Sequence, residues 1–175
     1  DFDDWEKSVN INMTSQLKTI HALYPMRDRR GKVNIALLAG GGTNNPFRCY
    51  SSYALSKIGL IKMCELIDDE ADDVNIFIVG PGFVKTKTHY ETLNAGNNAE
   101  SNFQRVKEFM DSDSKGTSFE SIYNCIQWAI AVGRDIAGGR NLSVVHDKWG
   151  SVGLENELIH DKDMYKLRRY KNDWI

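Results

Sequence analysis

Two short apolar runs, each followed by glycines, constrain the fold of this chain more than any other feature. Residues 33–39 read VNIALLA before a Gly-Gly-Gly triplet, and residues 74–79 read VNIFIV before Gly-Pro-Gly. Runs of this length that are rich in β-branched residues are typical of strands buried on both faces. Strands of that kind occur in parallel sheets that helices cover on both sides.

Amphipathic segments separate these runs. Apolar side chains recur at spacings of three and four through residues 3–24, which predicts a helix, and residues 51–68 predict a second, strongly apolar helix. Residues 119–130 predict a third helix and residues 141–145 a last strand, whereas residues 85–102 predict a mobile loop with short helical pieces. This order of helices and strands predicts an α/β fold with a parallel sheet covered on both faces.

Length and composition exclude several classes of protein. The 175 residues are 41% apolar, which is enough for one core, so we expect a single domain over residues 1–175. The 22 basic and 24 acidic side chains give a net charge of -2, unlike the basic surface of nucleic-acid binders. Cys49, Cys64 and Cys125 form no C-x-x-C pair, so we expect reduced thiols in a cytoplasmic protein and no metal site. No apolar run reaches the roughly 20 residues of a membrane span, so we expect no membrane insertion.

The sequence YALSK carries the chemistry. Tyr53 and Lys57 stand four residues apart near the start of a predicted helix, so both side chains project from one helical face. An ammonium close to a phenol favours the phenolate and lowers a pKa that is ordinarily about 10. A tyrosine so placed can exchange a proton with an alcohol or a carbonyl near neutral pH. A Y-x-x-x-K pattern by itself is weak, but here it follows a buried strand and a glycine-rich loop, which favours a catalytic pair.

The order of these motifs resembles that of the short-chain dehydrogenase/reductase (SDR) family. A strand, a glycine-rich loop, a YxxxK helix, a second strand and a PGxxxT motif (residues 81–86) follow one another at similar spacing in that family. The opening segment DFDDWEKSVNINMTS resembles the family helix in which an asparagine follows a tryptophan by seven residues, which selects Asn12 over Asn10. The tail IAGGRNLSVVHD resembles the closing strand, with Asp147 where an aspartate usually precedes glycines. The resemblance covers nearly the whole chain and implies a Rossmann-like, doubly wound parallel sheet.

The resemblance also implies roles for individual residues. Tyr53 would be the general acid/base, Lys57 would hold the nicotinamide ribose and lower the pKa of Tyr53, and Asn12 would anchor a water in a proton relay. The positions that correspond to cofactor-binding residues of the family are Tyr53, Lys57, Pro81, Gly82 and Thr86. The expected reaction is NAD(P)-dependent hydride transfer between nicotinamide and a carbonyl or alcohol substrate, with residues 87–102 covering the substrate.

Two departures from the family pattern qualify this expectation. The family places a serine roughly fourteen residues before the tyrosine, a position that Ala39 occupies here, and nearby registers offer only alanine or leucine. Loss of an oriented donor of this kind costs about 10²- to 10³-fold in rate, unless Thr43 replaces it. The glycine-rich turn that seats the cofactor pyrophosphate is also absent. We therefore expect the chain to be the C-terminal part of an SDR domain whose N-terminal half is missing, so that NAD or NADP binding requires that half.

Partners and alternatives follow from the same resemblance. Family members commonly pair through the two long helices, here residues 5–24 and 51–68, so we expect a homodimer or homotetramer. The glycine triplet and the tail MYKLRRY resemble members that act on surface-polysaccharide sugars, which suggests a sugar-derived substrate. The alternative is a catalytically impaired SDR-fold protein with a binding or regulatory role. The missing serine favours this alternative, and four residues present together oppose it: Tyr53, Lys57, Asn12 and Thr86.

Overall fold

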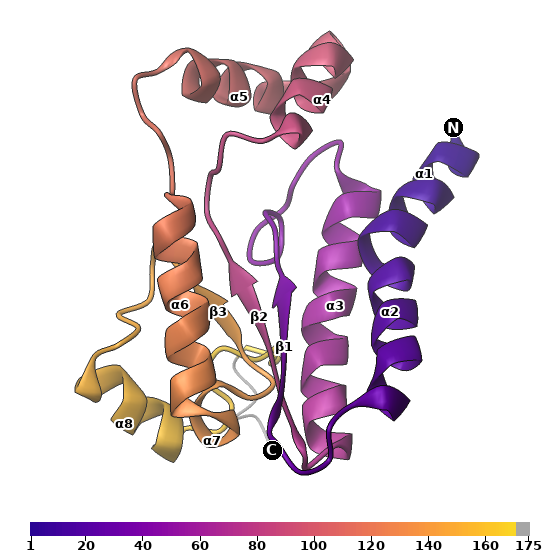
Figure 1. Ribbon diagram of the computed structural model, residues 1–175. Coiled ribbons are helices and arrows are strands. Elements are labelled where there is room, and N and C mark those ends of the chain that lie inside the picture. The colour runs from indigo at the N-terminus through magenta and orange to yellow at the C-terminus, as the bar shows by residue number, and fades with distance from the viewer. Residues whose placement is uncertain (171–175) are drawn as a thin grey trace.

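A computed structural model describes residues 1–170 as three layers, with helices on both faces of a parallel sheet (Figure 1). The strands are β1 (Val33–Leu38), β2 (Val74–Gly80) and β3 (Asn141–Ser143), in the order β1-β2-β3. Pairing is parallel, with Val33 opposite Val74 and Ile78 opposite Asn141. The predicted α/β class with helices on both faces is confirmed.

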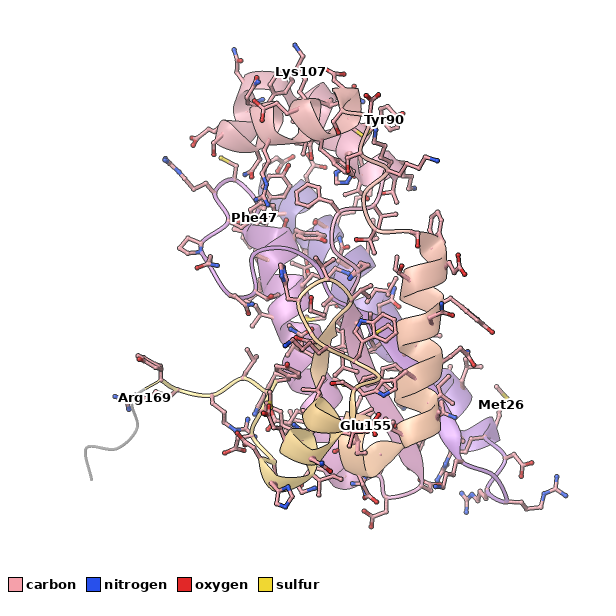
Figure 2. The ribbon with its side chains drawn as sticks, turned by 90° about the vertical axis from the view of Figure 1, so that its left-hand side faces the viewer. Met26, Phe47, Tyr90, Lys107, Glu155 and Arg169 are labelled. Atoms are coloured by element: carbon pink, nitrogen blue, oxygen red, sulfur yellow. The ribbon has the colours of Figure 1, made fainter. Side chains whose placement is uncertain are left out.

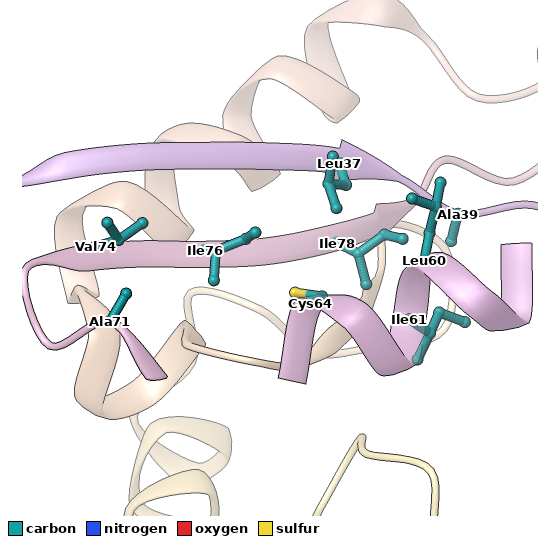
Figure 3. Close-up of a cluster of buried hydrophobic side chains, with 9 residues drawn as sticks. All are labelled: Leu37, Ala39, Leu60, Ile61, Cys64, Ala71, Val74, Ile76 and Ile78. Carbon is teal, nitrogen blue, oxygen red and sulfur yellow. The ribbon is translucent and has the colours of Figure 1, made fainter. Parts of the chain in front are cut away.

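The central strand β2 shows why the layers form. Its residues are buried throughout, and alternate side chains point to opposite faces of the sheet. Ile76 and Ile78 pack with Leu60 and Cys64 of helix α3 (Ser51–Glu70), as Figure 3 shows. On the other face, Phe77 and Val79 pack with side chains of helix α6 (Phe119–Val132). Burial of apolar surface on both faces therefore fixes the sheet between two helical layers.

The edge strand β1 departs from the prediction of a strand buried on both faces. Only Leu37 is buried among Val33–Leu38, and Leu38 is 50% exposed. Helix α3 and the N-terminal helix cover one face of β1, because Val33 and Ile35 pack into the same core as Leu60. The side chains of Asn34, Ala36 and Leu38 on the other face are exposed.

The N-terminal helix is not uniform. Helix α1 (Phe2–Val9) and helix α2 (Ser15–Leu23) are joined by a π-helical turn over Asn10–Thr14, and a 3-10 turn (Tyr24–Met26) ends the segment. The single α-helix predicted over residues 3–24 is therefore interrupted by a π-helical turn. Isolated π turns inside α-helices recur at functional sites, and this one contains Asn12.

Residues 87–111 form a helical cap, in the region where a loop with short helical pieces was expected over residues 85–102. The cap consists of α4 (Lys87–Ala95), a 3-10 turn (Gly96–Ala99) and α5 (Ser101–Asp111). It lies across the end of the molecule toward which the strands point (Figure 1). The short helical pieces expected within residues 85–102 are therefore present, they extend to Asp111, and the mobility of this segment stays a prediction.

The C-terminal segment closes the opposite end of the molecule. Helix α7 (Arg134–Ala137) precedes β3, and α8 (Val152–His160) follows it. Arg140 is only 2% exposed, and its guanidinium donates to the backbone oxygens of Leu158 (2.6 Å) and Met164 (2.6 Å). These hydrogen bonds pair the buried guanidinium with two backbone oxygens, one within α8 and one in the segment that follows it.

Candidate active site

Helix α3 positions Tyr53 and Lys57 at the carboxyl end of β1. The two side chains are one helical turn apart, and the Lys57 Nζ atom lies 5.6 Å from the centroid of the Tyr53 ring. Lys57 Nζ donates a hydrogen bond of 2.9 Å to the backbone oxygen of Leu38, the last residue of β1. The expected pairing of Tyr53 and Lys57 on one helical face is present, and the strand end fixes the position of the ammonium.

The electrostatics of the pair differ from the expectation. Burial raises the pKa of the Tyr53 phenol above its ordinary value, and the nearby Tyr50 raises it further. Burial lowers the pKa of the Lys57 ammonium. Burial is the main cause of the Tyr53 shift and Lys57 is not among its causes, so a lowering of the Tyr53 pKa by Lys57 stays a prediction. At neutral pH the phenol is protonated and can donate.

Gly40, which sequence reasoning did not select, faces the Tyr53 hydroxyl. A Cβ atom built on Gly40 would overlap the hydroxyl oxygen and lie 2.6 Å from the ring carbon that carries it. Ala39, by contrast, is buried in the core beside Leu60. Of these two residues, Gly40 faces the phenol and Ala39 does not, whereas the alignment of Ala39 with the family serine stays a prediction. Neither residue carries a hydroxyl.

An aromatic cluster surrounds Tyr53. Phe47 stacks on Tyr50 with ring centroids 4.3 Å apart, and both rings meet Tyr53 edge-on. The Tyr50 hydroxyl lies 2.6 Å from the Thr92 hydroxyl of α4, so the cluster is joined to the cap. Figure 2 shows Phe47 below the cap, whereas Tyr90 and Lys107 lie on the cap itself. The spacing of three between Tyr50 and Tyr53 on a predicted helix start was the signal that could have revealed this cluster.

Asn12 lies in the π-helical turn that packs beside α3. Trp5 Nε1 donates to the Ser51 hydroxyl (3.0 Å), and the Ser52 hydroxyl donates to the Ser8 hydroxyl (3.1 Å), so α1 is tied to the first turn of α3. The Asn12 Nδ2 atom donates to the Ser8 backbone oxygen (3.0 Å). Asn12 makes no hydrogen bond to Tyr53 or Lys57 within residues 1–170, so its part in a proton relay stays a prediction.

The PGFVKT segment begins at the carboxyl end of β2, the strand next to β1. Gly82 adopts φ +77°, a conformation that favours glycine, and a Cβ atom there would meet the Thr117 hydroxyl at 2.7 Å. Thr86 is the residue that precedes α4. Pro81, Gly82 and Thr86 thus lie in a tight connection between the sheet and the cap, and their contacts with a cofactor stay predictions.

Asp147 also has a structural partner. Its Oδ2 atom accepts a hydrogen bond from the Ser143 backbone N–H at 2.6 Å. Burial raises the pKa of Tyr165 to about 12, and the nearby Asp147 carboxylate contributes to that rise.

Within residues 1–170, no three His, Cys, Asp or Glu side chains gather closely enough to bind a metal ion. In the same residues no helix combines the length and apolar character needed to cross a bilayer.

Comparison with known proteins identifies the family. A family model described as short chain dehydrogenase matches residues 1–124. Among curated proteins, the dehydrogenase/reductase SDR family member 4 of Oryctolagus cuniculus is 26% identical over 84 residues, which are 47% of this chain and 32% of that protein. The chain therefore spans about a third of the length of that relative.

Solved structures agree in fold. A short-chain dehydrogenase/reductase from Saccharomyces cerevisiae superimposes with a TM-score of 0.69 at 18% identity, over 89% of this chain and 60% of that one. A protein from Burkholderia xenovorans described as a short-chain dehydrogenase/reductase gives a TM-score of 0.59 at 17% identity, over 82% and 56% of the two chains. At these identities the solved structures show a shared Rossmann-like fold. Because the family model matches residues 1–124, the chain belongs to the short-chain dehydrogenase/reductase family.

Proposed function

We propose that this chain forms the catalytic part of an NAD(P)-dependent oxidoreductase that interconverts a small carbonyl compound and its alcohol. One observation carries the proposal: Tyr53 and Lys57 project from one turn of α3 at the carboxyl end of β1, with the ammonium fixed on Leu38. Ligands of parallel α/β sheets bind at that end of the strands. Family membership supports the redox class.

The residues at this sheet edge fit the nicotinamide end of such a cofactor. A partly buried ammonium beside a protonated phenol can donate to ribose hydroxyls, and the exposed Gly82 turn follows the neighbouring strand. When bound, the nicotinamide supplies or accepts the hydride. NAD and NADP are not distinguished by these residues, because none of them would lie near the adenine ribose.

The work of this chain would then be proton transfer and orientation. Tyr53 would donate its proton to the carbonyl oxygen during reduction and accept it during oxidation. Lys57 would stabilise the phenolate that remains, because an adjacent positive charge favours the ionised form. Pro81, Gly82 and Thr86 would lie beside the nicotinamide, and the cap would exclude water from the reacting atoms.

Cofactor titration of the complete protein, including any residues that precede Asp1, tests the proposal. We expect NADH or NADPH to bind with a change in nicotinamide fluorescence, and Lys57→Met to weaken binding by about tenfold, as expected for loss of a charge-assisted hydrogen bond. Lys62→Met is the matched control, because Lys62 lies on the same helix and pairs with Glu65 instead. The proposal would be contradicted if neither NADH nor NADPH bound. It would also be contradicted if Lys57→Met and Lys62→Met weakened cofactor binding equally.

A second function is favoured by one observation. The Tyr53 hydroxyl occupies the space that a side chain of residue 40 would need, and Gly40 has no hydroxyl to donate there. A relative that keeps the fold and binds the cofactor without turnover would serve as a binding or regulatory protein. Cofactor binding without any Tyr53-dependent reduction of a panel of aldehydes and ketones would establish this alternative. A cytoplasmic location and pairing of copies through α1–α2 and α3 stay predictions.

A further inference from the structure

A cavity separate from the Tyr53 site opens at the carboxyl ends of β2 and β3. Its volume is about 870 Å³, within the range of small-molecule sites. Its walls come from the Gly82 turn, α5, the start of α6 and the segment after β3; the side chains that matter here are Phe83, Arg105, Phe109, Ser118, Ser121 and Trp149. Tyr53, Lys57 and Asn12 do not line it, and Gly82 is the one predicted cofactor residue that does.

The floor of the cavity is held by hydrogen bonds. The Thr117 N–H donates to the Phe83 backbone oxygen at 2.8 Å, and Val84 forms an antiparallel bridge with Gly116. The Trp149 indole N–H donates to the Val144 backbone oxygen at 3.0 Å, which satisfies its polar edge and leaves the ring to contact a ligand. These contacts fix the backbone beneath the cavity.

The walls combine aromatic rings with an unpaired cation. Phe83 and Phe109 meet edge-on with centroids 5.1 Å apart, and the Arg105 guanidinium carbon lies 4.7 Å from the centroid of Phe83. Arg105 has no carboxylate partner within residues 1–170, and none of the residues that line the cavity is acidic. A guanidinium placed over an aromatic ring and without a carboxylate partner keeps N–H donors available for a planar anion.

Two serine hydroxyls at the rim of the cavity are further hydrogen-bonding groups. The Ser118 hydroxyl caps α6 by accepting the Ser121 N–H at 3.0 Å, and the two serine hydroxyls are 2.9 Å apart. The start of this 14-residue helix faces the cavity with its positive end. Glu120, in the first turn of α6, is the acidic side chain at this end, and it does not line the cavity.

We propose that this cavity binds an aromatic carboxylate, whose ring would lie against Phe83, Phe109 and Trp149 and whose carboxylate would accept hydrogen bonds from Arg105. Because the Gly82 turn borders both the cavity and the proposed nicotinamide site, the ligand would be the distal, anionic part of the substrate. That identification rests on the proposed function, whereas binding in the cavity does not.

Binding of 2-naphthoate and of its neutral analogue 2-naphthamide, measured by calorimetry on the purified protein, tests the inference. We expect 2-naphthoate to bind with Kd below about 1 mM and about tenfold more tightly than 2-naphthamide, since a charge-assisted pair is lost with the amide. Arg105→Gln should weaken 2-naphthoate about tenfold and leave 2-naphthamide unchanged. Lys107→Gln is the matched control and should leave both affinities unchanged, because Lys107 is a cation of the same helix that does not line the cavity. Figure 2 shows Lys107 at the outer side of the cap.

A second variant keeps the test decisive. Val145 lines the cavity and is 55% exposed, so Val145→Trp should fill the cavity and abolish binding of both compounds without unfolding the protein. Equal affinity for the two compounds, an unaffected Arg105→Gln or unaffected Val145→Trp would overturn the inference. If 2-naphthoate binds as expected while no nicotinamide cofactor does, the proposed function fails and the cavity assignment stands.

Discussion

Replacing Tyr53 by phenylalanine should lower kcat by about 10³-fold while cofactor affinity changes little, because general acid–base catalysis contributes about 10²- to 10⁴-fold. The ring keeps its edge contacts with Phe47 and Tyr50, so the fold of the aromatic cluster is retained. Only the hydroxyl that faces Gly40 is lost. The measurement is steady-state reduction of the best carbonyl substrate in a panel, with cofactor in excess.

Tyr123→Phe is the control for this prediction. Tyr123 lies on α6 and is 60% exposed, so removal of its hydroxyl should leave kcat unchanged. A Tyr53→Phe protein that turns over at the wild-type rate would mean that another group, or water, delivers the proton. Tyr53 would then be a residue of the aromatic cluster and no more.

Gly40→Ala should reduce kcat/KM by about 100-fold, because a misplacement of about 1 Å in a reacting group costs that much. The added methyl would overlap the Tyr53 hydroxyl, which must move away from the position that it occupies. Since the displaced atoms are the far end of a side chain that is only partly buried, we expect little loss of stability. Circular dichroism melting alongside the kinetic assay separates the two effects.

The control and a converse variant sharpen this prediction. A Cβ atom on Gly31 would meet no atom within 4 Å, so Gly31→Ala should change neither rate nor stability. Gly40→Ser would place a hydroxyl beside the phenol, together with the same displacement of Tyr53. Wild-type kcat/KM in Gly40→Ala would show that the phenol is not held against residue 40 during catalysis.

The layers of the fold and the Tyr53–Lys57 pair were predictable because each depends on short-range periodicity. The apolar run at 74–79 could only be a buried strand, and Tyr53 and Lys57 had to share a face once residues 51–68 were helical. These inferences need no knowledge of what lies across the sheet.

The cap and the role of Gly40 depend on contacts that are distant in sequence. Helix α4 is anchored by the bond between Tyr50 and Thr92, which are 42 residues apart, and nothing in the polar sequence of 87–102 indicates that partner. That Gly40 faces the phenol while Ala39 lies in the core could not be predicted, because the alignment of a glycine triplet has no internal marker of register. The π turn at Asn12 is likewise set by packing against α3, where Met13 lies on Gly59.

The most direct test of the central claim is the titration of Tyr53 in the complete protein, followed by NMR of ¹³C-labelled tyrosine and assigned with Tyr53→Phe. Without cofactor the phenol should titrate above its ordinary pKa, because burial raises it. With the oxidised cofactor bound, a second positive charge beside Lys57 favours the phenolate, so the Tyr53 pKa should fall and the oxidised cofactor should bind more tightly as pH rises. A Tyr53 pKa that does not move when the cofactor saturates the protein would contradict the placement of this pair at the nicotinamide.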